Sequence, residues 1–278
     1  MLRSALRCVA LVACVGGEAR FKDPRDRPEC RDVYGARGLH SVTTVEDVIS
    51  GRGPEDARPL YECRMKSPYG RFVDALDGGP PVFFLEIPKT GSTTIKSWLH
   101  AEYAENKRNA RFDVRQSFTV VREPLARFLS GYGTVRHRGE RYWPFNETRF
   151  SEAEKFESFV DMLSAEGDRL ATQRPKDRCL WYHAFSQMWY FEFLPQRKVN
   201  YVLRLETLEA DLEHMLRAMP LVAKNATLLP ELPPRKNTRE GNFDSTELRA
   251  TSPGGIRKAM AYLKQDYACL GYPPADPP

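Results

Sequence analysis

The chain has 278 residues, of which 41% are hydrophobic and 11% aromatic, and this composition excludes a wholly disordered or collagen-like protein. The length allows one well-cored domain with peripheral segments and is too short for two large domains. Lysine and arginine outnumber aspartate and glutamate by 42 to 37, and the spread of both signs argues against a nucleic-acid-binding protein while leaving room for a local cationic pocket.

The first residues predict a targeting segment. Arg3 and Arg7 precede an apolar run over 8–15, and two glycines follow, which is typical of a secretory signal peptide or a short signal-anchor over 1–17. A buried N-terminal helix is the alternative. The run is shorter than the ~20 residues that span a bilayer comfortably. We therefore expect any membrane association to occur through this segment only.

Two N-glycosylation sequons fit entry into the secretory route. They are Asn146-Glu-Thr148 and Asn225-Ala-Thr227, and a sequon is meaningful only in a chain that enters this route. Each sequon alone is a weak signal. Together with the expected leader, they favour a protein of the secretory lumen.

Removal of residues 1–17 leaves four cysteines, which a luminal compartment would oxidise. Cys30 and Cys63 both lie in a region with few apolar contacts, so we predict that they pair. Cys179 with Cys269 follows by elimination, and the alternative for Cys269 is a buried free thiol. No Cys/His pattern has zinc-ligand spacing, so no structural metal is expected.

The chain divides into a stem and a core. Residues 18–79 are rich in Pro, Gly, Arg and Asp and predict a stem or extended N-terminal region, so the core is expected over 80–278. The hydrophobic pattern predicts strands and helices in alternation. The strands are expected over 82–87, 118–121 and 199–205, and the helices over 93–107, from 124 onward, 156–163, 181–193, 208–219 and 253–269. This order predicts an α/β fold with a parallel sheet covered by helices on both faces, in three layers.

The first candidate binding site is the segment Phe84-Leu-Glu-Ile-Pro-Lys-Thr-Gly-Ser-Thr-Thr-Ile-Lys96. A buried strand leads into a tight turn and a helix start, where amides without partners and the helix dipole attract anions. A lysine and three hydroxyl residues add donors: Lys89, Ser92, Thr93 and Thr94. An ordinary capped helix is the alternative, and it leaves these residues unexplained. The lysine precedes the glycine, so the segment is not the GxxxxGK[ST] loop of kinases and ATPases.

The second candidate segment is Phe118-Thr-Val-Val-Arg-Glu-Pro-Leu-Ala-Arg-Phe-Leu-Ser-Gly-Tyr132. Arg122 stands at the end of a predicted strand, where open α/β sheets bind ligands. Ser130 follows about two helical turns later, so a guanidinium and a hydroxyl can converge on one phosphate. A surface ion pair is the alternative for Arg122. Both segments together predict a ligand with anionic groups at two ends.

These segments resemble the motifs of Golgi carbohydrate sulfotransferases. Pro88-Lys-Thr-Gly-Ser-Thr-Thr94 is similar to their 5′-phosphosulfate loop, and the segment over 121–132, which includes Arg127, is similar to their 3′-phosphate motif. Two weaker segments, 201–211 and 234–240, resemble the heparan sulfate 2-O-sulfotransferase branch. The resemblance covers roughly residues 80–272 and implies a P-loop-NTPase-like sulfotransferase fold.

The resemblance implies transfer of a sulfuryl group from 3′-phosphoadenylyl sulfate (PAPS), as co-substrate, to a hydroxyl. Lys89 would neutralise charge that develops on the leaving 5′-phosphate. The expected PAPS-binding residues are Lys89, Thr90, Gly91, Ser92, Thr93 and Thr94 at the 5′-phosphate, Arg122 and Ser130 at the 3′-phosphate, and Arg235 and Lys236 from a basic loop. A transferring sulfuryl group carries less charge than a phosphoryl group, so no metal is expected.

The acceptor base is where the chain departs from the family pattern. The related branch has a catalytic histidine in a much longer segment between its two nucleotide motifs. We predict His183 as the base, because its ordinary pKa lies near the working pH and its aromatic neighbours can stack on a sugar. A packed structural histidine is the alternative. The other candidates are His100, Glu102, Glu105 and Asp113.

The predicted function is that of a PAPS-dependent sulfotransferase acting on a carbohydrate hydroxyl of a glycan acceptor, in the Golgi lumen or membrane or in a secreted form. A tyrosylprotein acceptor is a variant of this hypothesis. The rival hypothesis is a non-catalytic luminal protein that binds sulfated glycans or nucleotides, which the loss of an acceptor base would favour. Lys89 favours the enzyme, because binding alone does not require a charge at the leaving group.

Overall fold

The computed structural model describes residues 70–74, 81–103, 117–172, 180–191, 201–219, 221 and 245–273, and the description below concerns these parts of the chain. The expected leader, most of the expected stem, and the basic loop with Arg235 and Lys236 lie outside them. No helix in the described parts is long and apolar enough to cross a bilayer.

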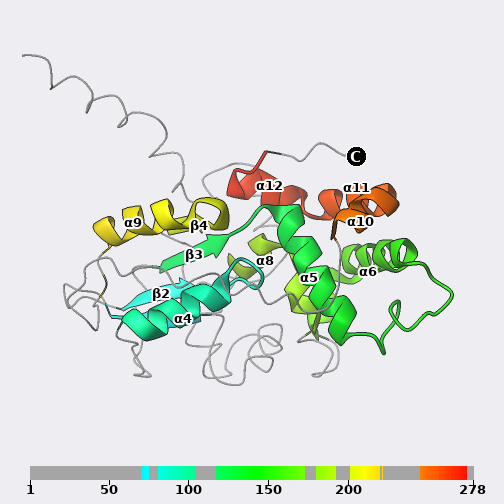
Figure 1. Cartoon of the computed structure of the whole chain (residues 1–278), viewed down its shortest axis with the longest axis horizontal. Helices are drawn as coiled ribbons and strands as arrows, with labels where there is room; N and C mark the ends of the chain where they lie inside the picture. The colour runs from blue at the N-terminus through cyan, green and yellow to red at the C-terminus, as the bar shows by residue number, and fades with distance from the viewer. Residues whose placement is uncertain are drawn as a thin grey trace, which may run out of the picture.

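The strands of the described residues form one four-stranded sheet in the order β1-β2-β3-β4 (Figure 1). They are β1 (Gly70–Val73), β2 (Val82–Leu85), β3 (Ser117–Val121) and β4 (Tyr201–Arg204). Every residue of β2 and β3 is buried, as expected for strands covered on both faces. The strands β2, β3 and β4 run parallel, so their carboxyl ends meet at one edge of the sheet.

The first strand corrects the expectation of a wholly parallel sheet. β1 pairs antiparallel with β2, with Arg71 opposite Phe84, so the sheet is mixed and not wholly parallel. β1 also lies before residue 80, within the segment expected to be a stem. The run Gly70–Val73 is too short to carry a clear alternation of polar and apolar residues, so the hydrophobic pattern alone did not reveal it.

Helices fill the connections between the strands and follow the last one. They are α4 (Ser92–Glu102), α5 (Pro124–Arg138), α6 (Glu152–Thr172), η3 (Tyr182–Ala184), α8 (Gln187–Phe191), η4 (Leu205–Thr207), α9 (Leu208–Ala218), α10 (Ser245–Thr251), α11 (Pro253–Tyr262) and α12 (Lys264–Leu270). Figure 1 shows α6, α10 and α11 grouped on the side of α5 that faces away from α4 and α9.

The sheet separates two hydrophobic cores. Phe83 and Leu85 of β2 belong to a core with α5, α6, α8 and the C-terminal helices, whereas Val82 and Phe84 belong to a core with α4 and α9. Successive side chains of a strand point to opposite faces, so the two cores cover the two faces. The expected α/β fold with helices on both sides of the sheet is thereby confirmed.

Two segments predicted as single helices are interrupted. The segment over 181–193 contains η3 and α8, because Phe185 is extended and a new helix begins at Gln187. The segment over 253–269 contains α11 and α12, which meet at the fully buried Leu263. Asp266 of α12 accepts hydrogen bonds from the amides of Gln187 and Met188 at 2.7 and 2.9 Å. A residue of α12, the helix that begins after the break at Leu263, therefore caps the start of α8.

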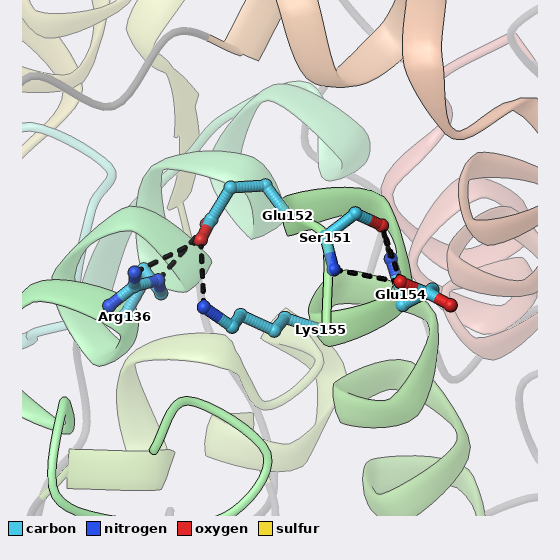
Figure 2. A network of polar contacts seen from close by, with 5 residues as sticks. All are labelled: Arg136, Ser151, Glu152, Glu154 and Lys155. Carbon is cyan, nitrogen blue, oxygen red and sulfur yellow. Dashed lines mark hydrogen bonds and ion pairs between the residues drawn. The ribbon is translucent and has the colours of Figure 1, made fainter. Parts of the chain in front are cut away.

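Charged side chains join the end of α5 to the start of α6, as Figure 2 shows. Arg136 donates two hydrogen bonds of 3.0 Å to the carboxylate of Glu152, and Lys155 donates a third at 3.2 Å. Ser151 and Glu154 form a reciprocal capping box, in which the Ser151 amide donates to the Glu154 carboxylate and the Glu154 amide donates to the Ser151 hydroxyl. These bonds fix the start of α6 against α5.

Cys269 is buried in α12 and is disulfide-bonded, which differs from the free thiol that the sequence left open. The cysteine bonded to it, and the remaining cysteines, lie outside the described residues. The pairings of Cys30 with Cys63 and of Cys179 with Cys269 therefore stay predictions.

The Arg136–Glu152 pair predicts a pH-dependent contribution to stability. The hydrogen bonds from Arg136 hold the pKa of Glu152 below its ordinary value of 4.5. A carboxylate with a lowered folded-state pKa stabilises the fold above its unfolded-state pKa, and the contribution is lost as pH falls through the folded-state value. We expect Glu152→Gln to cost less than about 1 kcal/mol at pH 7, because the pair is largely exposed.

Urea unfolding at pH 7 and at pH 3 measures this effect. The difference between wild type and Glu152→Gln should shrink toward zero at the lower pH. Glu209→Gln, which changes an exposed glutamate of α9, is the control. A difference that grows on acidification would contradict the assignment.

Candidate active site

The loop between β2 and α4 has a strained backbone. Lys89 and Gly91 both have positive φ angles, of 69° and 81°. Among the described residues, Lys89 is the only residue other than glycine with a positive φ. A side chain in this conformation costs on the order of 1–2 kcal/mol, and such strain concentrates at functional sites. Glycine is favoured at the second position, because side chains rarely adopt a φ of 81°.

The start of α4 presents amides and hydroxyls at the end of this loop. The amides of Thr94 and Ile95 both donate to the Gly91 carbonyl, at 2.9 and 3.2 Å, so the helical hydrogen bonds begin there. The preceding amides of Ser92 and Thr93 belong to the helix start, where the helix dipole favours an anion. Thr93 is exposed at this mouth, whereas Ser92 and Thr94 are buried. This geometry fits the predicted anion cradle.

Thr90 has a different role in the loop. Its hydroxyl donates to the Ile87 carbonyl at 2.8 Å and its side chain is fully buried. The hydroxyl therefore closes the loop, and only the amide remains as a donor that Thr90 can offer to a ligand. The carboxylate of Glu86, at the start of the loop, pairs with Lys96 of α4 at 2.8 Å. This pair ties the end of the strand to the helix that follows.

Arg122 brings the second motif to the loop. It follows β3, which lies beside β2, and its guanidinium Nη1 lies 3.4 Å from the Lys89 carbonyl as a hydrogen-bond donor. Its backbone is clamped by Gln187, whose side-chain amide accepts from the Arg122 N–H at 2.9 Å and donates to the Arg122 carbonyl at 2.8 Å. The structure therefore brings together the two segments that the sequence singled out.

Arg127 is fully buried and links three segments. Its Nε donates to the Pro88 carbonyl of the loop at 3.0 Å, and its Nη1 donates to the Phe185 carbonyl between η3 and α8. The guanidinium lies over the Tyr190 ring, 5.6 Å from its centre, a cation–π geometry. One side chain thus holds the loop, helix α5 and the aromatic segment in one arrangement.

A buried carboxylate completes this arrangement from α12. Asp266 has no exposed surface, and its burial raises its pKa. The amides of Gln187 and Met188 and the charge of Arg127 act against this rise, because they favour the ionised form. Asp266 thereby positions Gln187, and Gln187 positions the backbone of Arg122.

Ser130 and His183 lie where α5 meets η3. A Cβ on Gly131 would lie 2.2 Å from the carbonyl oxygen of His183, so glycine is required for this close approach. Ser130 precedes that contact, about 9 Å along the helix from Pro124, and is half-buried. The half-buried His183 ring packs against Tyr182, with ring centres 4.3 Å apart and ring planes tilted by 30°. The structure therefore places His183 beside the helix that carries the second motif.

The other candidate bases lie elsewhere. His100 is exposed and Glu102 is half-buried, both in the last turn of α4. His100 is about 12 Å along the helix from Ser92, at ~1.5 Å per residue. Glu105 and Asp113 lie outside the described residues, as do Arg235 and Lys236. No group of three or more His, Cys, Asp or Glu side chains gathers as a metal site in the described parts.

The end of the chain closes the same edge of the sheet. Tyr267 donates to the Glu123 carboxylate at 2.6 Å, and Tyr272 donates to the Glu206 carboxylate at 2.9 Å. Burial, together with Glu206, raises the pKa of Tyr272 well above its usual range, so its hydroxyl stays a donor. The Arg204 guanidinium lies 4.8 Å from the centre of the Tyr272 ring. These contacts dock the C-terminal segment on the ends of β3 and β4.

The sequence interpretation assigned no role to Arg127, Gln187 or Asp266. Arg127 had one signal, its place in the segment similar to the 3′-phosphate motif. The hydrophobic pattern did not indicate its burial, because Arg127 lies on the face of α5 opposite the apolar stripe of Leu125, Phe128, Leu129 and Tyr132. Gln187 and Asp266 had none, because they act through contacts between segments far apart in the chain.

We expect Arg127→Lys to destabilise the fold by about 1–3 kcal/mol. An ammonium group is a point donor and cannot reproduce the fork that serves both carbonyls, so one buried acceptor loses its partner. Guanidinium unfolding gives the free-energy change. Arg138→Lys, at the exposed end of the same helix, is the control and should stay within about 0.5 kcal/mol of wild type. Equal effects of the two changes would remove the bridging role from Arg127.

Comparison with known proteins identifies the family of the chain. Residues 75–273 match the model of the sulfotransferase family. No curated protein and no solved structure matches the chain. The matched segment covers more than half of the chain and contains both strand-end motifs together with Arg127, Gln187 and Asp266. The chain therefore belongs to the sulfotransferase family, and it is an enzyme of the class that takes its sulfuryl group from PAPS.

Proposed function

We propose that this enzyme transfers a sulfuryl group from PAPS to a hydroxyl of a glycan acceptor in the secretory lumen. The observation that carries the proposal is the hydrogen bond of Arg122 to the Lys89 carbonyl. It joins the 5′-phosphosulfate-like loop to the 3′-phosphate-like motif at one edge of the sheet. A donor with a phosphosulfate at one end and a phosphate at the other matches this pair of cationic groups.

In the proposed mechanism, the acceptor oxygen forms a bond to sulfur while the bond between sulfur and the 5′-phosphate oxygen breaks. Lys89 and the amides at the start of α4 stabilise the charge that develops on the leaving oxygen. Arg122 and Ser130 bind the 3′-phosphate, and Arg235 and Lys236 add charge from the basic loop. A base takes the proton of the acceptor hydroxyl.

His183 is the base that we propose. It is two residues from Phe185, whose carbonyl is bound by Arg127, and Arg127 also binds Pro88 beside Lys89. This short series of contacts supports a position near the loop. His100 and Glu102 lie in the last turn of α4, away from the loop, which favours His183 over them.

The acceptor class and the location rest on the sequence. The resemblance to Golgi carbohydrate sulfotransferases, with the heparan sulfate 2-O branch as the nearest type, supports a glycan. The targeting segment, the sequons and the cysteines support a Golgi or secreted glycoprotein. Incubation of the full chain with sulfur-labelled PAPS, a panel of glycosaminoglycans and tyrosine peptides tests the proposal. Label on the peptides alone would assign a tyrosylprotein acceptor, and no label on any acceptor would favour a binding protein.

We expect Lys89→Ala to lower the turnover number by on the order of 100- to 1,000-fold, the usual effect of losing one donor to a developing oxyanion. Affinity for the bisphosphate product should fall much less, because the loop amides and Arg122 still bind it. Initial rates and calorimetric titration measure the two effects. Lys258→Ala, which removes a surface charge from α11, is the control. Turnover near the wild-type value in Lys89→Ala would exclude the lysine from the mechanism.

We expect His183→Ala to bind PAPS normally and to lose most of its transfer rate, together with the acid limb of the pH–rate profile. The limb should disappear because protonation of the histidine removes the base. His100→Ala is the matched control and should keep both the rate and the profile. If His183→Ala lowers only the melting temperature and retains full specific activity, the histidine is a packing residue.

A further inference from the structure

We propose that Asn146 carries an N-linked glycan whose first sugar packs on the indole ring of Trp143. The inference rests on the luminal route in the proposed function and concerns a part of the molecule away from the active site. Asn146 lies in the turn that joins α5 to α6, seen at the lower right of Figure 1. Helix α5, with 15 residues, separates this turn from Arg122 by about 22 Å at ~1.5 Å per residue.

The acceptor side chains of the sequon are accessible. Asn146 and Thr148 are both exposed, and Glu147 between them is half-buried. The Glu147 carboxylate lies 3.3 Å from Arg149, so its charge is paired beside the acceptor amide. An exposed Asn-x-Thr segment on a turn meets the steric requirement for glycosylation.

Trp143 is the unusual feature of this turn. Its side chain is 48% exposed, and among the described residues it is the only large hydrophobic side chain that is exposed. The two residues that follow it, Pro144 and Phe145, are buried, and Phe145 (4% exposed) stacks on Trp181 with ring centres 6.1 Å apart. Single exposed apolar side chains are common. Trp143 is of interest because it lies three residues before the sequon asparagine, Asn146.

The backbone of the turn sets Trp143 beside Asn146. The Tyr142 carbonyl accepts hydrogen bonds from the amides of Phe145 and Asn146, at 2.7 and 2.9 Å, and the Pro144 carbonyl accepts from Glu147 at 3.2 Å. These bonds close a tight turn around the cis peptide bond between Trp143 and Pro144, and they place the Asn146 amide against the carbonyl that precedes Trp143. A sugar attached to Asn146 therefore starts beside the exposed indole.

The first sugar of an N-linked glycan fits this surface. N-acetylglucosamine has an apolar face and an acetamido methyl group, and covering the indole with them removes apolar surface from water. In the transfer, a bond forms between Asn146 Nδ2 and C1 of the sugar as the bond from C1 to a polyprenyl diphosphate breaks. The diphosphate leaves with the electron pair, and the amide nitrogen releases one proton.

The test uses full-length chains secreted from a eukaryotic host. Every chain carries Asn225→Gln, so that the second sequon does not contribute, and each is made with its own N-terminus and with a heterologous secretion leader. Thr148→Ala removes the sequon while it keeps Asn146 and Trp143. Trp143→Ala keeps the sequon and removes the indole. The measurements are peptide mass spectrometry and melting temperature, before and after enzymatic trimming to the first sugar or complete removal.

We expect the Asn146 peptide to carry hexosamine in the parent chain and in Trp143→Ala, and to be unmodified in Thr148→Ala. Complete removal of the glycan should lower the melting temperature of the parent by about 2–4 °C, a shift typical of one favourable contact. Trimming to the first sugar should leave the melting temperature of the parent unchanged. In Trp143→Ala, complete removal of the glycan should not lower the melting temperature.

An unmodified Asn146 in the leader-directed secreted chain would overturn the site, and an equal effect of removal in the parent and in Trp143→Ala would overturn the sugar–indole contact. Glycosylation only with the heterologous leader supports the site and contradicts the luminal route of the proposed function.

Discussion

The candidate active site depends on one buried guanidinium. Arg127 lies without exposed surface between the loop after β2 and the segment between η3 and α8, and it donates to a backbone carbonyl of each. A buried charge is costly unless hydrogen bonds and nearby charges compensate it. Here two carbonyls, the face of Tyr190 and the nearby Asp266 provide the compensation. Because the charge is stable only when these groups surround it, the packing of α5 and the conformation of the loop are mutually dependent.

The same constraint extends through backbone contacts to the rest of the site. Asp266 caps α8, α8 presents Gln187, and Gln187 clamps the backbone of Arg122. The strained Lys89 is therefore held between a strand, a helix start and the Arg122 guanidinium. Preorganised donors of this kind stabilise a developing charge without rearranging during the reaction. The stability of the buried network and the electrostatics of the site thus have a common origin.

The sequence predicted the parts of this site that depend on local order. The apolar run before Pro88, the glycine and the hydroxyl residues after Lys89, and the position of Arg122 after a second strand all follow from patterns within a few residues. The division of the aromatic segment into η3 and α8 does not follow from such a local pattern. Asp266, whose carboxylate caps the start of α8, lies 79 residues after Gln187. β1 was missed because its pairing with β2, and not its own pattern, orders it. The loop over 234–240 and the candidates Glu105 and Asp113 lie outside the described residues, so their roles stay predictions.

We propose that the strand ends recognise a nucleotide with phosphates at both the 3′ and 5′ positions. Calorimetric titration with adenosine 3′,5′-bisphosphate and with adenosine 5′-monophosphate tests it most directly. A charged hydrogen bond to phosphate is worth about 1.5–3 kcal/mol, so wild type should bind the bisphosphate about 10- to 150-fold more tightly, and Arg122→Ala should bind the two nucleotides nearly alike. Equal affinities in wild type, or an undiminished preference in Arg122→Ala, would contradict recognition of the 3′-phosphate by Arg122.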